Sequence, residues 1–214
     1  LAVDADAGTI VFGLVPPEAR PLDLRRYSSQ VYGAATYETG EGPFTRTHGA
    51  TGIAKASELM LRFDTAGPDD APERGLFFTR PARPLAAPEA FAASEVVGRL
   101  APPRPGRFAK AEEAMARVME FLVRERDARG WYGLMHFGDI MCAYYGDLDR
   151  WAFDDGGYAW INTEHRPDYG LWLQALRGAR ADWLAAAVEM TRHNRDVDMY
   201  HRGMHKGSGT RHNV

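Results

Sequence analysis

The hydrophobic residues of this chain change their spacing once, near residue 100, and the change separates two kinds of predicted structure. Before it, apolar side chains recur at every second position of residues 57–64, which predicts a half-buried strand. Further short strands are predicted over residues 8–15, 76–79 and 95–100, between segments rich in Pro, Gly and Asp. We therefore expect a β-sandwich-like domain over residues 1–104.

A proline-rich segment, residues 101–107, follows these strands. Proline lacks an amide donor and restricts the residue before it, so we expect this segment to break any regular element and to mark a domain boundary. After it, apolar residues follow the helical period. Three helices are predicted, over residues 108–129, 168–177 and 181–197. Helices joined by long aromatic and polar loops suggest an α/α toroid over residues 105–214, although periodicity alone does not establish that architecture.

Composition narrows the classes of partner. The chain has 214 residues, of which 45% are hydrophobic and 26% charged, and this is ordinary for a globular protein of one large or two smaller domains. The formal net charge is −3 without a basic run, which argues against a nucleic-acid partner. The single cysteine, Cys142, excludes an internal disulfide. No apolar run approaches the roughly 18 residues of a membrane span, so we expect no membrane partner.

Neither end of the sequence resembles a natural terminus. The chain begins at Leu1, and it ends just after a glycine-rich loop, residues 206–210. We therefore expect a fragment of a longer protein. The absence of a recognisable signal peptide then leaves both a secreted and a cytoplasmic location open, and the oligomeric state is open as well.

Residues 131–214 carry the densest set of chemically active side chains. Six of the seven histidines lie there, together with tyrosines, tryptophans and carboxylates in short loops. Such a combination packs badly in a core but suits sugar binding and proton transfer. His193 is the exception, because it lies on the apolar face of its predicted helix, where a satisfied core histidine is the more frequent case.

Six motifs in this stretch resemble the exo-rhamnogalacturonan lyase and YetA-like family: residues 136–139, 151–158, 162–167, 192–194, 198–201 and 209–213. The resemblance covers about residues 105–214 and extends more loosely over 1–100. It implies a central β-sandwich in the first half and the opening helices of a C-terminal α/α toroid in the second. An incomplete ring is expected to expose apolar faces.

The resemblance also implies an activity, β-elimination at galacturonate in a rhamnogalacturonan-like polysaccharide. That reaction needs the uronate carboxylate neutralised, a base to take the C5 proton and an acid to protonate the leaving glycosidic oxygen. Histidine and tyrosine can serve as base and acid near neutral pH when the site tunes them. No cofactor is expected, and the partner would be an oligo- or polysaccharide.

The candidate residues follow from these roles. The base and acid are sought among His136, His165, His201 and His212, with Tyr158 and Tyr200 as partners. The carboxylate is expected to meet Arg166, Arg211 or Asn162, because forked donors match it. Trp131, Trp160 and Tyr169 could offer flat faces to a sugar, and Asp139 and Glu164 could hold hydroxyl groups or orient a histidine. The 162–167 loop could equally use its polar groups for its own backbone.

Other functions and sites compete. A glycoside hydrolase on a similar toroid would use two carboxylates facing each other, from Asp139, Asp154, Asp155 and Glu164. A non-catalytic carbohydrate-binding or scaffold module would bind sugar without forming a product. The excess of histidine and tyrosine favours elimination. No metal site is expected, because Gly203 interrupts the helix on which His201 and His205 would have to share a face.

Overall fold

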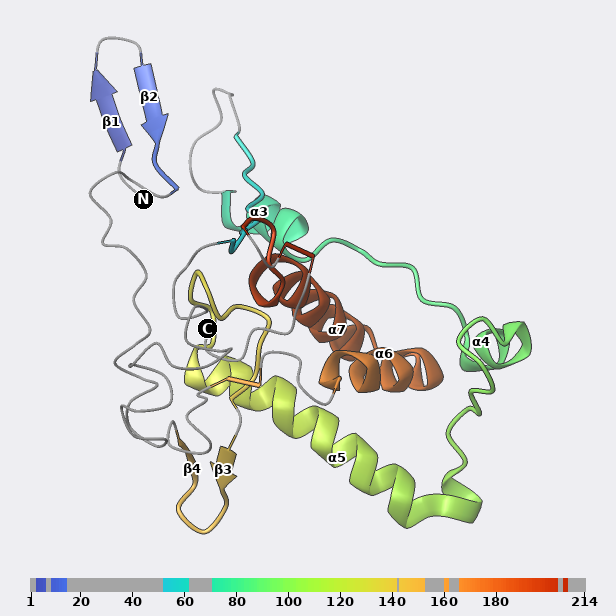
Figure 1. Ribbon diagram of the computed structural model, residues 1–214. Coiled ribbons are helices and arrows are strands. Elements are labelled where there is room, and N and C mark those ends of the chain that lie inside the picture. The colour runs from blue at the N-terminus through green and yellow to red at the C-terminus, as the bar shows by residue number, and fades with distance from the viewer. Residues whose placement is uncertain are drawn as a thin grey trace.

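The computed structural model describes residues 3–6, 9–14, 52–61, 71–141, 143–152, 160–161, 166–203 and 206–207, and these are mostly helical (Figure 1). In chain order the elements are β1 (Val3–Asp6), β2 (Thr9–Phe12), α3 (Ala71–Thr79), α4 (Pro88–Ser94), α5 (Pro105–Arg129), β3 (Ala143–Tyr145), β4 (Arg150–Ala152), α6 (Pro167–Gly178), α7 (Ala181–His193) and the π-helical segment η2 (Asn194–Asp198). Each strand pair is an antiparallel hairpin, and β1–β2 stands apart from the helices in Figure 1.

The three helices predicted after the proline-rich segment are confirmed as α5, α6 and α7. Their ends follow local rules. Gly130 takes a left-handed conformation after α5 (φ 66°) and its N–H donates to the carbonyl of Arg126, which closes the last turn. α6 packs against α7, α5 packs against α7, and α4 covers α6. None of the described helices is long and apolar enough to cross a membrane.

The core lies where these helices meet the loop that follows α5. One cluster of buried side chains joins that loop to α6 and α7, and it comprises Trp131, Ile140, Met141, Leu171, Ala187 and Met190. A second cluster, Ala175, Trp183 and Leu184, lies between α6 and α7 and receives Leu85 from the segment before α4. The loop after α5 is therefore part of the core, and its backbone is fixed by packing.

Most of the predicted strands are wrong, although the first one contains β2. The predicted strand over residues 57–64 is described only as far as residue 61, and residues 57–61 are irregular and exposed, without a partner strand among the described residues. Residues 76–79 belong to α3, which begins with the helix-starting sequence Ala-Pro-Glu. Residues 95–100 form a turn, since Glu95 and Gly98 have positive φ. The described residues contain no β-sandwich, only two hairpins.

The proline-rich segment is partly regular, against expectation. Pro105 begins α5, because a proline in the first turn loses no intrahelical hydrogen bond. The residues before it are tied to the helices, since Arg177 donates from Nε to the carbonyl of Ala101 (3.1 Å) and from both terminal nitrogens to Glu112 (2.8 and 2.7 Å). The domain boundary after residue 104 stays a prediction.

Trp151, on the unpredicted β3–β4 hairpin, anchors that hairpin to α5. Its indole Nε1 donates to Oε2 of buried Glu125 (3.0 Å), which also accepts from Arg129 Nε (3.1 Å). Burial alone would raise the pKa of Glu125, but the hydrogen bonds from Trp151 and Arg129 outweigh it and the pKa is lowered. Glu125 is thus a buried carboxylate that depends on two donors.

Replacing Trp151 with phenylalanine is expected to lower the free energy of unfolding by about 1–3 kcal/mol, because a buried carboxylate oxygen loses a donor. Urea unfolding of the chain measures the loss. Trp172→Phe is the matched control, since the half-buried Trp172 donates from Nε1 to Thr191 Oγ1 (2.9 Å) in a hydrogen bond that is exposed to solvent. Equal losses in the two variants would contradict the account of Glu125.

Candidate functional site

The candidate site is built on the loop between α5 and β3, residues 131–141, which rests on the last turns of α7. Gly138 makes the contact, with φ 98° and no room for a side chain. A Cβ there would lie 2.3 Å from the carbonyl oxygen of Glu189 and 3.1 Å from His193 Cβ. Only glycine allows this approach, which holds His136 and Asp139 at the end of α7.

The His136 side chain contacts the backbone of Gly133 and the indole of Trp160. Its ring stacks on Trp160, with centroids 4.5 Å apart and planes 9° apart, and its Nε2 accepts from the N–H of Gly133 (3.0 Å). A Cβ on Gly133 would fall 2.2 Å from the His136 ring, so a side chain at this position would displace the imidazole. Because Nε2 accepts, the proton of the neutral ring lies on Nδ1. His136 therefore presents a hydrogen-bond donor.

The protonation of His136 is set by its surroundings. Burial lowers its pKa, and the charges of His193 and Lys55 lower it further. The ring is half-buried and stays neutral at neutral pH. A neutral, fixed imidazole on an aromatic surface suits recognition of a polar group of a sugar.

Trp160 is fixed as firmly as the histidine it supports. The backbone of Met141 and Trp160 forms an antiparallel bridge, and the N–H of Ile161 donates to the carbonyl of Ile140 (2.9 Å). The Trp160 ring also meets Trp131 edge to face at 5.7 Å between centroids. Trp131 itself is 4% exposed and belongs to the core, so its ring cannot face a sugar in this geometry. Trp160 is thus half-buried and shared between the core and the His136 ring.

A buried cluster of charged side chains lies beneath the loop. His193 Nε2 is 3.2 Å from Asp198 Oδ1 and 3.4 Å from Asp139 Oδ2, and all three residues are at most 2% exposed. Burial would lower the pKa of His193, but the hydrogen bond with Asp198 and the charges of both carboxylates outweigh it and raise the pKa. The histidinium ties the loop to α7 and to η2.

Sequence reasoning took His193 for a core residue, and it is buried, but its two carboxylate partners were not foreseen. Asp139 is a sequence candidate for holding substrate hydroxyl groups or for orienting a histidine. In the structure it faces His193 and is only 1% exposed. Its Oδ1 accepts from the N–H of Ile140 (2.8 Å). The geometry fits the orienting role.

A segment far away in sequence, residues 52–58, docks against η2 and the residues after it. The N–H groups of Ala54 and Ala56 donate to the carbonyl oxygen and to Oδ2 of Asp196, both at 2.9 Å. The N–H of His201 donates to the carbonyl of Gly52 (2.8 Å). This docking brings Lys55, which sequence reasoning missed, to the ring of Phe137 in the loop.

The remaining described candidates lie at two places. Tyr200 and His201 follow η2 beside residue 52; Tyr200 is half-buried, and His201 is exposed with Nε2 2.6 Å from the carbonyl of Arg195. Arg166 and Tyr169 lie exposed at the start of α6, where Arg166 pairs with Asp168 (3.8 Å). The other candidates lie outside the described residues: Tyr158, Asn162, Glu164, His165, Arg211 and His212, together with Asp154, Asp155 and His205.

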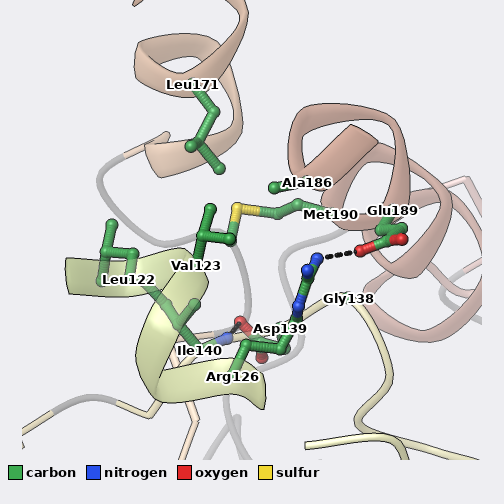
Figure 2. A pocket seen from close by; sticks show the side chains of 10 residues that line it. All are labelled: Leu122, Val123, Arg126, Gly138, Asp139, Ile140, Leu171, Ala186, Glu189 and Met190. Atoms are coloured by element: carbon green, nitrogen blue, oxygen red, sulfur yellow. Dashed lines mark hydrogen bonds and ion pairs between the residues drawn. The ribbon is translucent and has the colours of Figure 1, made fainter. Parts of the chain in front are cut away.

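A small pocket opens beside the loop, between α5, α6 and α7 (Figure 2). Arg126 points across it to Glu189, with which it forms an ion pair, and the other lining residues are mostly apolar. Burial raises the pKa of Glu189, an effect that Arg126 opposes. The cavity volume of about 20 Å³ admits one water molecule and no sugar ring.

Across the residues that the structure describes, no three His, Cys, Asp or Glu side chains gather where they could hold a metal ion. In the Asp139–His193–Asp198 cluster the His193 imidazole, when protonated, is itself the cation between the two carboxylates.

Comparison with known proteins gives two findings. A family model described as the PcRGLX-like protein C-terminal alpha/alpha toroid domain matches residues 81–214. The "Uncharacterized protein YetA" of Bacillus subtilis (strain 168) is 33% identical over 205 residues, which are 94% of this chain and 24% of that protein. The chain thus spans about a quarter of the length of the curated relative it matches. These findings support a toroid for the helical part.

Proposed function

Because this chain belongs to the PcRGLX-like family, which is rhamnogalacturonan-lyase-like, and carries its α/α toroid domain, we propose that the full-length protein cleaves a uronate-containing pectic polysaccharide by β-elimination. The substrate class is a rhamnogalacturonan-like chain with galacturonate at the cleavage position. The match to an uncharacterized relative assigns no activity, so the proposal draws on the described site.

The observation that carries the proposal is the pair formed by His136 and Trp160. The indole provides an aromatic surface at the edge of the core, and the imidazole stacked on it carries its proton on Nδ1, because Nε2 accepts from Gly133. Because the pKa of His136 is lowered by burial, it stays a neutral donor at neutral pH. Such a donor, fixed before the substrate arrives, can stabilise negative charge on a bound uronate.

Elimination places that negative charge on the carboxylate. A base removes the C5 proton, and the electron pair passes into a new C4–C5 double bond. The bond between C4 and the glycosidic oxygen breaks, and an acid protonates the leaving oxygen. In the transition state the carboxylate takes up part of the C5 electron pair, so a donor at its oxygens lowers the barrier.

In this proposal His136 binds the uronate carboxylate, and other residues act as the base and the acid. Those groups are sought among Tyr200 and His201, which follow η2, and among the candidates beyond the described residues: Tyr158, His165 and His212. The remaining proposed carboxylate and sugar contacts are Arg166, Tyr169, Asn162, Glu164 and Arg211. Variants of these residues are tested by the same measurement, the formation of unsaturated product from rhamnogalacturonan.

Hydrolysis finds less support in the described residues. A hydrolase needs two carboxylates that reach the sugar. Asp139 is only 1% exposed and faces His193, so it cannot touch a substrate in this geometry. A hydrolase would have to rely on Asp154, Asp155 and Glu164, which lie outside the described residues.

The ultraviolet absorbance of unsaturated uronate, followed during incubation of the full-length protein with rhamnogalacturonan, tests the proposal. We expect the wild type to raise the absorbance and His136→Gln to slow it by about 10²-fold or more, because one preorganised donor is lost. Arg117→Gln is the control, since its side chain on α5 is exposed and pairs with Glu113 at the surface. New reducing ends without absorbance would contradict elimination.

A further inference from the structure

Lys55 is held in place through its neighbours. The N–H groups on either side of it, those of Ala54 and Ala56, both donate to Asp196, so the backbone at Lys55 cannot move without breaking two hydrogen bonds. The side chain then extends to the loop, where Nζ lies 5.8 Å from the centroid of the Phe137 ring. That distance is within the range of a cation–π contact.

Burial removes part of the water around the Lys55 side chain, and no ion pair with a described residue compensates for it. The side chain is half-buried, yet among the described residues its Nζ makes no hydrogen bond or ion pair. Burial lowers the pKa of Lys55, and the charge of Asp196 opposes this effect. A lysine ammonium carries three donors, and here an aromatic face satisfies none of them.

The oxygens of Asp196, the carboxylate whose charge acts on Lys55, already accept other hydrogen bonds. Its Oδ1 accepts from Arg195 Nε (2.8 Å) and its Oδ2 accepts from the N–H of Ala56 (2.9 Å). Burial would raise the pKa of Asp196, but these donors outweigh it and the pKa is lowered. The carboxylate can attract Lys55 at longer range, but its oxygens serve the docked backbone and Arg195.

Lys55 also shares its surroundings with His136. Its contact with the ring of Phe137, the residue after His136, places the ammonium group against the loop, and its positive charge lowers the pKa of His136 and opposes protonation of His193. Among the residues expected from sequence to meet the carboxylate, Arg166 is exposed and already pairs with Asp168 (3.8 Å). Lys55 is the described cation that adjoins the His136 loop and has no anionic partner.

We propose that Lys55 binds the carboxylate of the uronate substrate, beside the Nδ1–H of His136, so that a segment distant in sequence from the histidine-rich loops completes the substrate site. This inference rests on the proposed function for the identity of the anion. A charged ammonium next to a neutral imidazole donor would neutralise the carboxylate in the ground state and stabilise the extra charge of the transition state.

The test compares two substrates with the full-length protein: a rhamnogalacturonan oligosaccharide with free galacturonates and the same oligosaccharide as its methyl ester. Lys55→Gln is expected to reduce kcat/KM for the free acid by about 10²-fold and to leave the ester nearly unchanged. Lys55→Arg should restore part of the loss. Arg192→Gln is the matched control, because Arg192 also meets the docked segment, through Glu58 (3.1 Å), but at an exposed position.

A purely structural role would give a different pattern. If Lys55 only held the docked segment, Lys55→Gln would slow both substrates by the same factor, and the inference would be overturned. It would be overturned equally if the variant kept the wild-type preference for the free acid. Far-ultraviolet circular dichroism of each variant establishes that the folded protein is being compared.

A binding measurement tests the carboxylate site at Lys55 independently of whether the protein catalyses elimination. Calorimetric titration with the free-acid oligosaccharide and with its carboxyl-reduced, neutral analogue measures recognition without turnover. Absence of any unsaturated product would contradict elimination, whereas loss of free-acid selectivity in Lys55→Gln would still support the carboxylate site. Wild-type binding that does not distinguish acid from neutral analogue would overturn the site even if the product forms.

Discussion

Replacing His193 with alanine is expected to lower the free energy of unfolding by about 3–5 kcal/mol, the cost of removing one partner from a buried ion pair. The substitution leaves Asp139 and Asp198 facing each other without their shared cation, both at most 1% exposed. It also removes the tie between the loop, α7 and η2. Urea unfolding of the chain, followed by tryptophan fluorescence, measures the change.

The same experiment has a pH dependence of known sign. The folded-state pKa of His193 is raised above the ordinary value of about 6.5 by Asp198 and Asp139, which outweigh burial. A raised pKa stabilises the fold fully below that ordinary value, and the contribution is lost as pH rises through the folded pKa. The stability difference between wild type and His193→Ala should therefore shrink as pH rises above about 6.5.

Arg192 supplies the control for His193 at the neighbouring position of α7. Its exposed ion pair with Glu58 is expected to contribute about 0–1 kcal/mol, so Arg192→Ala should cost little. If His193→Ala costs no more than Arg192→Ala, or if its cost does not change with pH, the buried cluster does not stabilise the fold as described.

Gly138→Ala is expected to cost about 2–5 kcal/mol, from a strained positive φ together with a steric clash. The added Cβ would lie 2.3 Å from the carbonyl oxygen of Glu189, which belongs to helix backbone and cannot move aside. The loop would have to lift from α7, and Asp139 would leave His193. Urea unfolding measures the stability loss, and the slower appearance of unsaturated product should accompany it in the full-length protein.

Gly170 in α6 is the matched control for Gly138. It lies inside a helix, and a Cβ there meets nothing within 4 Å. Gly170→Ala should stabilise the chain by about 0.5–1 kcal/mol, because glycine in a helix interior is unfavourable. A Gly138→Ala variant as stable as wild type would contradict the close packing of the loop on α7.

Sequence patterns predicted the helices, whose formation depends on nearby residues, better than the strands. The helices α5 and α7 follow from apolar spacing, and the end of α5 at Gly130 follows from the left-handed conformation that glycine permits. A strand needs a partner that its own sequence does not specify, and residues 57–61 have none among the described residues. The apolar residues 76–79 were assigned to a strand because the preceding proline was not weighed as a helix start.

In the candidate site, too, some residues could be named from sequence and others could not. The motif at 136–139 and the aromatic residue Trp160 drew attention to the loop, and the structure brings His136 and Trp160 into one stack. Lys55 could not be found from sequence, because the hydrogen bonds that position it, such as Ala56 to Asp196, join residues 140 apart. Asp198 was likewise hidden, since its pairing with His193 depends on the π-helical turn of η2.

The mass of the cleavage product tests the central claim most directly. The full-length protein is incubated with rhamnogalacturonan oligosaccharides, and the new non-reducing ends are weighed by mass spectrometry. Elimination predicts ends that are lighter by one water than hydrolysis products, because they carry a C4–C5 double bond. Products with the mass of hydrolysed chains would contradict the account, and so would an intact substrate.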